Sequence, residues 1–380
     1  MQNYRIEFGD GCEHMTLKKF LKEEIVLVVL VFLSIILTIA VPGHINEYIS
    51  FIDWKTVLTL LSLIIIATGL KQSGYMDLAA DKILARINNE RVLTAFMVTL
   101  SMALSAFLTN DITLFIVVPL TLCMQKTLKN NLVKVVVFEA IAVNTGSTLT
   151  PIGNPQNLFL WNMWGISFAG FIIKMAPLFV LMAAVLYFFT LFFVRNTRLQ
   201  FNAGAEKIRI NKVLGILSSC LMLGFLAALQ FKAGLYLLPV IIILYFAVDK
   251  KVLRDIDWLL IATFILMFID FALLAKLGAV AAILKSVDLT KSRGVFAVSA
   301  VLSQAMSNVP AAIFTAKFSG NWQAIAFGVD CGGNGFIIGS LANLIALRLI
   351  RPKRTGSWWE FHKYSIPFFV ITGIVVYFFL

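Results

Sequence analysis

The sequence predicts an all-α polytopic membrane protein made of two inverted repeats, each with a re-entrant helical hairpin and a broken transmembrane helix. About nine spans accompany the two hairpins. Hydrophobic residues make up 60% of the 380-residue chain and charged residues only 14%, whereas soluble domains carry about 25% charged residues. Apolar runs of roughly 16–25 residues recur along the chain. Two of these runs are interrupted by polar residues with glycine, and the first also contains two prolines.

The first interruption, Asn144–Asn157, lies between the apolar runs Leu132–Val143 and Leu158–Phe171. Proline removes a backbone donor and glycine weakens a helix, so a continuous span is not expected here. In hydrocarbon, irregular backbone is tolerated only where protein or a water-filled cavity surrounds it. The stretch therefore predicts a helix broken inside the membrane, which is typical of secondary transporters. A polar loop between two membrane helices is the alternative.

The other elements follow from apolar length. Tyr75–Asn89 is charged and amphipathic and predicts a surface helix. The runs that predict uninterrupted spans are Ile25–Val41, Trp54–Leu70, Ala176–Val194, Val213–Phe231, Leu235–Val248, Trp258–Ala275 and Ser365–Leu380.

Two further pairs of apolar runs are joined by very short polar tips. Only Thr109–Asp111 separates Val92–Leu108 from Ile112–Thr127. Three residues cannot form a solvated loop between two full spans, so a hairpin with its tip inside the membrane is expected. The second hairpin is predicted from Gly294–Met306 and Ala311–Phe318, which flank Ser307–Pro310. The second helix break is predicted at Asp330–Gly335, within Trp322–Leu349.

The two halves repeat. Six residues match between the broken segments at one offset of 186 positions, among them Gly146 with Gly332 and Asn157 with Asn343. The predicted organisation is a cytoplasmic N-terminal segment (1–24), a first transmembrane repeat (25–194), a linker with a linker helix (195–234) and a second, inverted repeat (235–380). In such folds the binding site lies between the repeats.

Charge predicts the orientation. The net charge is +12, but the basic residues lie between apolar runs, and 24 of the 32 Lys and Arg residues fall on one predicted side. The positive-inside rule makes that side, with the N-terminus, cytoplasmic and places the C-terminus outside. We expect an integral protein of a prokaryotic cytoplasmic (inner) membrane whose partners are the lipid bilayer and a small substrate, with no nucleic acid.

Four polar segments should meet at the site, namely two tips and two breaks. Helix N-termini there suit an anion or oxyacid, whereas C-termini and unwound carbonyls suit a cation. The candidate substrate-binding residues are Thr109, Asn110, Asn144, Thr145, Gly146, Ser147, Thr148, Gly153, Asn154, Gln156, Asn157, Ser307, Asn308, Gly332, Gly333, Asn334, Ser340 and Asn343. A Na⁺ ion is expected at Asn110, Ser147 and Asn308, and no cofactor beyond coupling Na⁺ or H⁺. The alternative for each single residue is a helix cap.

Acidic residues in apolar runs are candidates for coupling, because a membrane interior disfavours a charged carboxylate. Asp111 lies at the first tip, Asp330 at the second break and Asp270 inside an apolar run. Asp270 could instead form a structural ion pair with Lys276 or Lys71. Glu139, shortly before the first break, is a weaker candidate.

The chain contains no metalloprotease, nucleophile-elbow or nucleotide-binding motif, which argues against a familiar enzyme and against a primary pump. A membrane-embedded sensor or enzyme would need an effector domain or a nucleophile–base pair, and no segment predicts either.

The residues also resemble a known family. Thr148–Asn157 is similar to the TPIGNPQN segment of arsenite-permease-like (ArsB) and NhaD-like proteins of the ion transporter superfamily. Leu108–Asp111 and Ser307–Pro310 resemble the hairpin tips of arsenite permeases, and Asp330 with Ile338–Leu341 resembles their second-repeat segment. A more distant similarity extends to divalent anion/sodium symporters. The resemblance implies an inverted-repeat fold that is often a homodimer and moves like an elevator.

These observations predict a secondary active transporter that moves a small anion or oxyacid coupled to H⁺ or Na⁺. Here the tips read Thr-Asn-Asp and Ser-Asn-Val instead of the symporters' Ser-Asn-Thr, and the acidic tip favours proton coupling. The alternative is a Na⁺/H⁺ antiporter of the NhaD type.

Overall fold

The computed structural model describes residues 25–128, 132–199, 209–230, 234–277, 288–350 and 357–380. These residues are mainly helical, and the only β-type pairing among them is an isolated bridge between Asn89 and Arg198. The prediction of an all-α chain is confirmed for this part of the chain.

By contacts between backbones the chain divides into two compact units. The first comprises the described residues of Met1–Leu78 and Glu206–Leu273, and the second those of Ala79–Ala205 and Leu274–Leu380. Both sequence halves contribute to each unit, so this division differs from the predicted succession of repeats. The repeat boundaries stay a prediction.

The helices begin and end close to the predicted runs. In chain order they are α2 (Ile25–Ala40), η1 (Pro42–Glu47), α3 (Tyr48–Phe51), α4 (Trp54–Gln72), α5 (Tyr75–Arg86), α6 (Glu90–Phe107), α7 (Asn110–Cys123), α8 (Gln125–Leu128), α9 (Leu132–Ser147), α10 (Pro155–Trp164), α11 (Phe168–Phe193), α12 (Lys212–Gln230), α13 (Gly234–Val248), α14 (Lys250–Arg254), α15 (Trp258–Lys276), α17 (Ser292–Met306), α18 (Asn308–Thr315), α19 (Trp322–Gly332), η3 (Ile337–Gly339), α20 (Leu341–Ile350) and α21 (Ser357–Phe379).

In the first unit, α4 packs against α12 and α13. A glycine permits this approach, because a Cβ atom at Gly69 would overlap the ring of Tyr245 and lie 2.6 Å from the Ser218 hydroxyl. The Tyr245 hydroxyl donates to Ser218 Oγ at 2.8 Å. This buried bond fixes three helices at one point.

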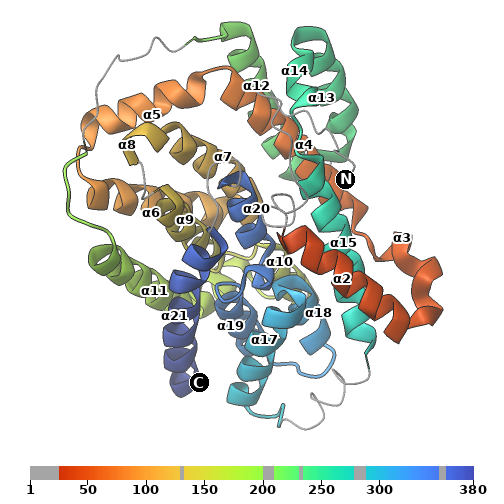
Figure 1. Cartoon of the computed structure of the whole chain (residues 1–380). Coiled ribbons are helices and arrows are strands. Elements are labelled where there is room, and N and C mark those ends of the chain that lie inside the picture. The colour runs from red at the N-terminus through yellow and green to blue at the C-terminus, as the bar shows by residue number, and fades with distance from the viewer. Residues whose placement is uncertain (1–24, 129–131, 200–208, 231–233, 278–287, 351–356) are drawn as a thin grey trace, which may run out of the picture. The chain divides into compact units, whose positions relative to one another are not determined.

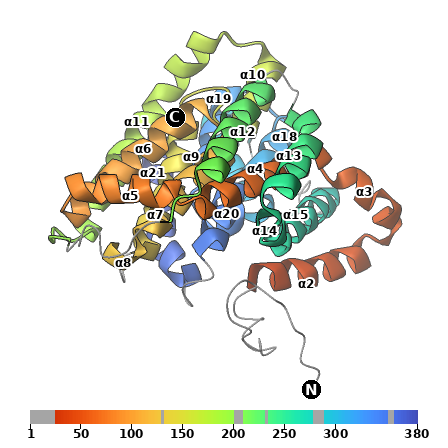
Figure 2. The ribbon, with the colours of Figure 1, turned by 90° about the horizontal axis from the view of Figure 1, so that it is seen from above.

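The second unit contains both predicted hairpins and both predicted breaks (Figure 1). α6 and α7 form the first hairpin and pack on α9, and α17 and α18 form the second and pack on α19. Beyond each break the partners change: α10 packs on α18 and α19, and α20 packs on α7 and α9. Figure 2 shows this unit from above. Each broken helix thus connects both hairpins.

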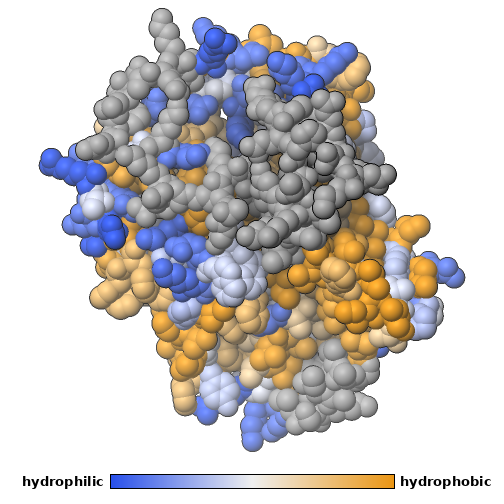
Figure 3. Space-filling model, viewed as in Figure 1, coloured by the Kyte–Doolittle hydropathy of each residue, from blue (hydrophilic) through white to orange (hydrophobic). Residues whose placement is uncertain are grey.

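Four helices of the described part are long and apolar enough to cross a membrane: α4, α6, α11 and α21. A fifth span results if the bent pair Leu27–Ala40 and Pro42–Phe51 counts as one. α6 is long enough to span although the sequence predicts it as a hairpin arm. Hydrophobic residues cover wide areas of the face in Figure 3, and side chains such as Ile173 (70%) and Phe378 (72%) are largely exposed. Such surfaces fit a lipid environment.

Candidate functional site

The first break runs from Thr148 to Asn154, between α9 and α10. α10 begins as its sequence predicts, because Asn154 Oδ1 accepts from the Asn157 backbone at 2.8 Å and Pro155 has no N–H that would need an acceptor. The Asn157 amide in turn donates to the carbonyl oxygens of Ser147 (3.3 Å) and Thr148 (3.4 Å), which have lost their helical partners. Side chains within the break therefore provide hydrogen-bond partners for backbone groups at the two helix ends.

Both helices continue further than predicted. Asn144–Ser147 forms the last turn of α9, and Asp330–Gly332 forms the last turn of α19. Short side chains stabilise the first of these turns, since Ser147 Oγ donates to the Asn144 carbonyl at 2.9 Å. The second break is thus Gly333–Ser340 rather than Asp330–Gly335. Asp330 and Asn144 project from helices toward the site.

Asn144 joins the two breaks. Its amide donates to the Gly333 carbonyl at 3.2 Å and to Asn343 Oδ1 at 2.9 Å. Its own Oδ1 accepts from the Ser340 hydroxyl at 3.1 Å. One side chain of α9 therefore holds the end of α19 and the start of α20.

Asp330 makes the corresponding connection from the second broken helix to the first break. Its Oδ1 accepts from the amides of Asn154 (3.2 Å) and Gln156 (3.0 Å), both from the first break. The side chains of all three residues are at most 3% exposed. A buried carboxylate held by two amide donors is a strong, geometrically specific contact.

Several of these contacts come in pairs separated by 186 residues. Asn157 donates to the Ser147 carbonyl (3.3 Å), and Asn343 donates to the Gly333 carbonyl (2.7 Å). The Asn154–Asp330 bond has the Ser340–Asn144 bond as its counterpart. The members of this second pair differ, because the Asn154–Asp330 bond involves an acidic side chain and the Ser340–Asn144 bond does not.

Two glycines at the same offset allow hairpin and broken helix to touch. A Cβ atom at Gly146 would overlap the Met102 carbonyl oxygen on α6, and one at Gly332 would overlap the Ser303 hydroxyl on α17. Neither helix could approach as closely with a larger residue.

The hairpin tips lie beside the breaks. The Asn110 backbone donates to the Gly153 carbonyl at 3.0 Å, and Asn308 Nδ2 lies 3.2 Å from the Cβ position of Gly333. Asn110 and Asn308 are the first residues of α7 and α18, and each side chain bonds the next backbone N–H: Asn110 Oδ1 accepts from Asp111 (2.9 Å) and Asn308 Oδ1 from Val309 (3.0 Å).

Ser307 distinguishes the second tip. It has φ = 67°, and no other non-glycine residue of the described part has a positive φ. Such a conformation costs on the order of 1–3 kcal/mol and persists where the surroundings require it.

The buried polar atoms that have no hydrogen-bond partner among the described residues are informative. In and near the breaks and the first tip they are all oxygens: Asp111 Oδ1, Thr145 Oγ1, Gln156 Oε1, Asn157 Oδ1, Asp330 Oδ2 and Asn334 Oδ1. Asn334 also donates to the Asp330 carbonyl at 3.1 Å. Gln156 and Asn334 both bond Asp330, so their unpartnered oxygens lie close to it and suit a cation or a proton-bearing ligand.

Every predicted site residue except Asp270 lies in the second unit, and all of these except the half-buried Thr109 are buried. Asp270 lies in the first unit, where it accepts a hydrogen bond from the Ser34 hydroxyl. No group of three or more His, Cys, Asp or Glu residues in the described part could hold a metal ion.

Gln304 was not predicted from the sequence. From α17 its amide donates to the Gly332 carbonyl at 2.7 Å, and its Oε1 accepts from the Phe336 backbone at 2.8 Å. In the other half Thr150 donates from the break to the Ala106 carbonyl at 2.5 Å. A glutamine three residues before the predicted tip was the only available signal.

Side chains of α21 form hydrogen bonds with the backbone of the second break. The Ser365 hydroxyl donates to the Gly335 carbonyl at 2.8 Å, and the Ile337 backbone donates to His362 Nε2 at 3.4 Å. Neither residue was predicted as part of the site.

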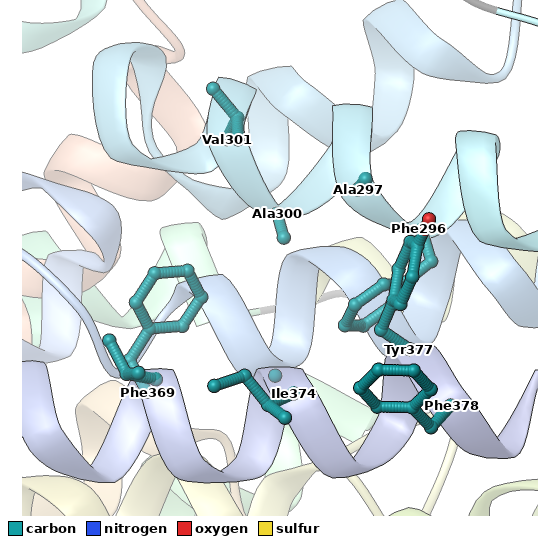
Figure 4. Close-up of a pocket in the computed structure, with 10 residues that line it drawn as sticks. Phe296, Ala297, Ala300, Val301, Phe369, Ile374, Tyr377 and Phe378 are labelled. Carbon is teal, nitrogen blue, oxygen red and sulfur yellow. The ribbon is translucent and has the colours of Figure 1, made fainter.

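A separate pocket lies between α17 and α21 (Figure 4). Its lining is apolar and aromatic and includes Phe296, Ala300, Phe369 and Tyr377. None of the predicted site residues contributes to it, so it is not the polar site at the breaks.

Comparison with known proteins gives the family of the chain. The model of the citrate transporter family (CitMHS) matches residues 19–329. The inner membrane protein YbiR of Escherichia coli strain K12 is 38% identical over 92% of this chain and 93% of its own. The uncharacterized transporter MJ0456 of Methanocaldococcus jannaschii is 34% identical over 84% of this chain and 88% of its own.

A weaker similarity concerns the family named from the sequence. A putative transporter arsB of Dictyostelium discoideum is 25% identical over 33% of this chain and 22% of its own. The family and relatives indicate an integral membrane transporter rather than an enzyme.

Proposed function

Because the chain belongs to the citrate transporter family, we propose that it is a secondary active transporter for a small anion, coupled to H⁺ or Na⁺. Citrate and related carboxylates are the first substrates to test, since the family is described as a citrate transporter. The arsenite-permease and NhaD subtypes stay predictions.

One observation carries the proposal: two broken helices are hydrogen-bonded to each other through Asn144 and Asp330. The N-termini of α10 and α20 lie at the two breaks, and helix N-termini suit a carboxylate or oxyacid. The side-chain amides of Asn154, Gln156 and Asn343 are neutral donors that bind protein oxygens in the described conformation and would exchange them for the anion. A neutral site can release an anion more readily than a site of fixed positive charges.

The coupling ion is proposed to bind around Asp330. Asp330 Oδ2, Gln156 Oε1 and Asn334 Oδ1 are buried oxygens without a hydrogen-bond partner among the described residues. Na⁺ would take such oxygens as ligands, and H⁺ would neutralise the carboxylate. The Na⁺ ligands expected at Asn110, Ser147 and Asn308 belong to the adjoining tips and first break.

The paired contacts at the 186-residue offset support the inverted repeat. We propose that hairpins and breaks move together as one transport unit, that the N-terminus is cytoplasmic and the C-terminus outside, and that the chain works in an inner membrane, where a homodimer is one arrangement. YbiR is named an inner membrane protein.

Ligand-induced stabilisation tests the function. Thermal unfolding of the purified protein is measured with citrate, other carboxylates and oxyanions, each with Na⁺, Li⁺ or lowered pH. A ligand at 100 times its Kd adds about 2.7 kcal/mol. We expect an anion to stabilise the protein only together with Na⁺ or at low pH. Stabilisation by Na⁺ or Li⁺ alone, with no stabilisation by any anion, would favour the Na⁺/H⁺ antiporter instead.

Asp111→Asn is expected to leave folding intact and weaken the pH dependence of transport. Asp111 is buried, and its Oδ1 has no hydrogen-bond partner among the described residues. The variant keeps the shape of the tip but cannot bind and release a proton. Uptake into proteoliposomes as a function of pH measures this, and an unchanged pH profile would exclude Asp111 from coupling.

A further inference from the structure

Glu139 is a buried acid that the proposed site does not use. It lies on α9, two turns before the end of that helix at Ser147, and its side chain is 0% exposed. The Thr121 hydroxyl on α7 donates to Glu139 Oε1. The other oxygen, Oε2, has no hydrogen-bond partner among the described residues.

No described basic residue makes an ion pair or hydrogen bond with Glu139. α6, α7, α11, α20 and α21 pack against α9, and several ionisable side chains on them have contacts elsewhere. Arg91 donates to the Val194 carbonyl, Tyr187 bonds Thr99, Lys363 lies over the Tyr364 ring, and Arg348 has a contact of its own. The other ionisable groups on these helices are Glu90, Asp111, Cys123, Lys174, Glu360, His362, Tyr364 and Tyr377.

A charged carboxylate with one hydroxyl partner in such surroundings would be strongly unfavourable. The neutral acid needs only that one contact. The geometry therefore favours a protonated Glu139 in the conformation described.

Packing alone does not explain an acid at this place. At the 186-residue offset that relates the two breaks, the counterpart of Glu139 is Ile325, which is also fully buried. The equivalent position of α19 is therefore filled by an apolar residue. An acid is unnecessary for a helix in this environment, so a chemical role is the better explanation.

We propose that Glu139 is a proton-carrying residue of the transport cycle, additional to the acids at the tip and break. The carboxylate takes a proton from water on one side of the membrane, carries it while buried beneath Thr121, and returns it to water on the other side. Only one O–H bond forms and breaks. The inference rests on the proposed transport function, because it needs a cycle that exposes α9 alternately.

The protonation state can be measured without any substrate. Infrared difference spectra of the purified protein at neutral pH compare wild type with Glu139→Gln. We expect the band of a buried, protonated carboxyl group to be lost in the variant. Loss of ionised-carboxylate absorption instead would overturn the proposal. Glu139→Ile, which copies the residue of the other half, serves as a second variant if Gln disturbs folding.

The carrier role is measured in proteoliposomes as protons moved per substrate. We expect Glu139→Gln and Glu139→Ile to lower this ratio by one, while Thr121→Val, which keeps the carboxyl group, leaves it unchanged. An unchanged ratio in the Glu139 variants would exclude the carrier role. Absence of transport by the wild type would refute the proposed function, and with it the carrier role, whereas the infrared result separately decides the protonation state.

Discussion

Replacing Asp330 by Asn is expected to lower cation-coupled transport by at least about 100-fold. Asp330 accepts from the amides of Asn154 and Gln156, and each hydrogen bond to a charged group is worth about 1.5–3 kcal/mol. An asparagine presents an amino group where an oxygen was and cannot neutralise a cation. Initial rates of uptake into proteoliposomes, with and without a Na⁺ or H⁺ gradient, measure the loss.

The molecule provides a matched control for this variant. Ser340→Ala removes the Ser340–Asn144 bond, which is the neutral counterpart of the Asn154–Asp330 bond. A neutral hydrogen bond contributes about 0.5–1.5 kcal/mol, so we expect no more than about a tenfold loss. Equal rates and equal cation dependence in Asp330→Asn and wild type would contradict the role of Asp330.

Gly146→Ala is expected to destabilise the protein by about 3 kcal/mol, the upper end of the range for overpacking. The added Cβ would overlap the Met102 carbonyl oxygen and Cα, and backbone atoms inside a helix cannot move aside. The thermal unfolding midpoint of the purified protein and the yield of folded protein should both fall.

Two other glycines calibrate this result. Outside the backbone of its own helix, no atom of the described residues lies within 4 Å of the Cβ position of Gly224 on α12, so Gly224→Ala should leave stability unchanged or raise it by up to about 1 kcal/mol through helix propensity. Gly332→Ala would meet the Ser303 hydroxyl first, and a side chain can rotate, so its loss should be smaller than that of Gly146→Ala. If the Gly146→Ala and Gly224→Ala variants had the same thermal unfolding midpoint, the close packing of α6 on α9 would be wrong.

The helices were largely predictable because apolar length and the Pro–Gly content of the breaks are local properties. The sequence predicted α9 to end at Val143, yet α9 continues to Ser147 because Ser147 and Thr148 hydrogen-bond back onto its last turn. Such local compensation is difficult to infer from composition. It shifts a helix end without changing which residues face the site.

The site was predictable as a set of residues but not as a set of contacts. Asp330 and Asn154 are 176 positions apart, and no periodicity encodes which amide meets which carboxylate. Gln304 was missed for the same reason, because its role depends on the Gly332 carbonyl 28 residues away. Asp270, which shares the apolar context of the other acids, belongs to a different compact unit.

The reciprocal bonds between the breaks also affect how the chain can be made. Asn144, Asn154 and Gln156 receive their partners only when residues 330–343 have been synthesised. At about 5–20 residues per second, the first break waits for roughly 10–40 s without these partners from the second half. During that interval the nascent first half is the form most exposed to misfolding and to membrane proteases, and a fragment ending before α19 would remain in that state.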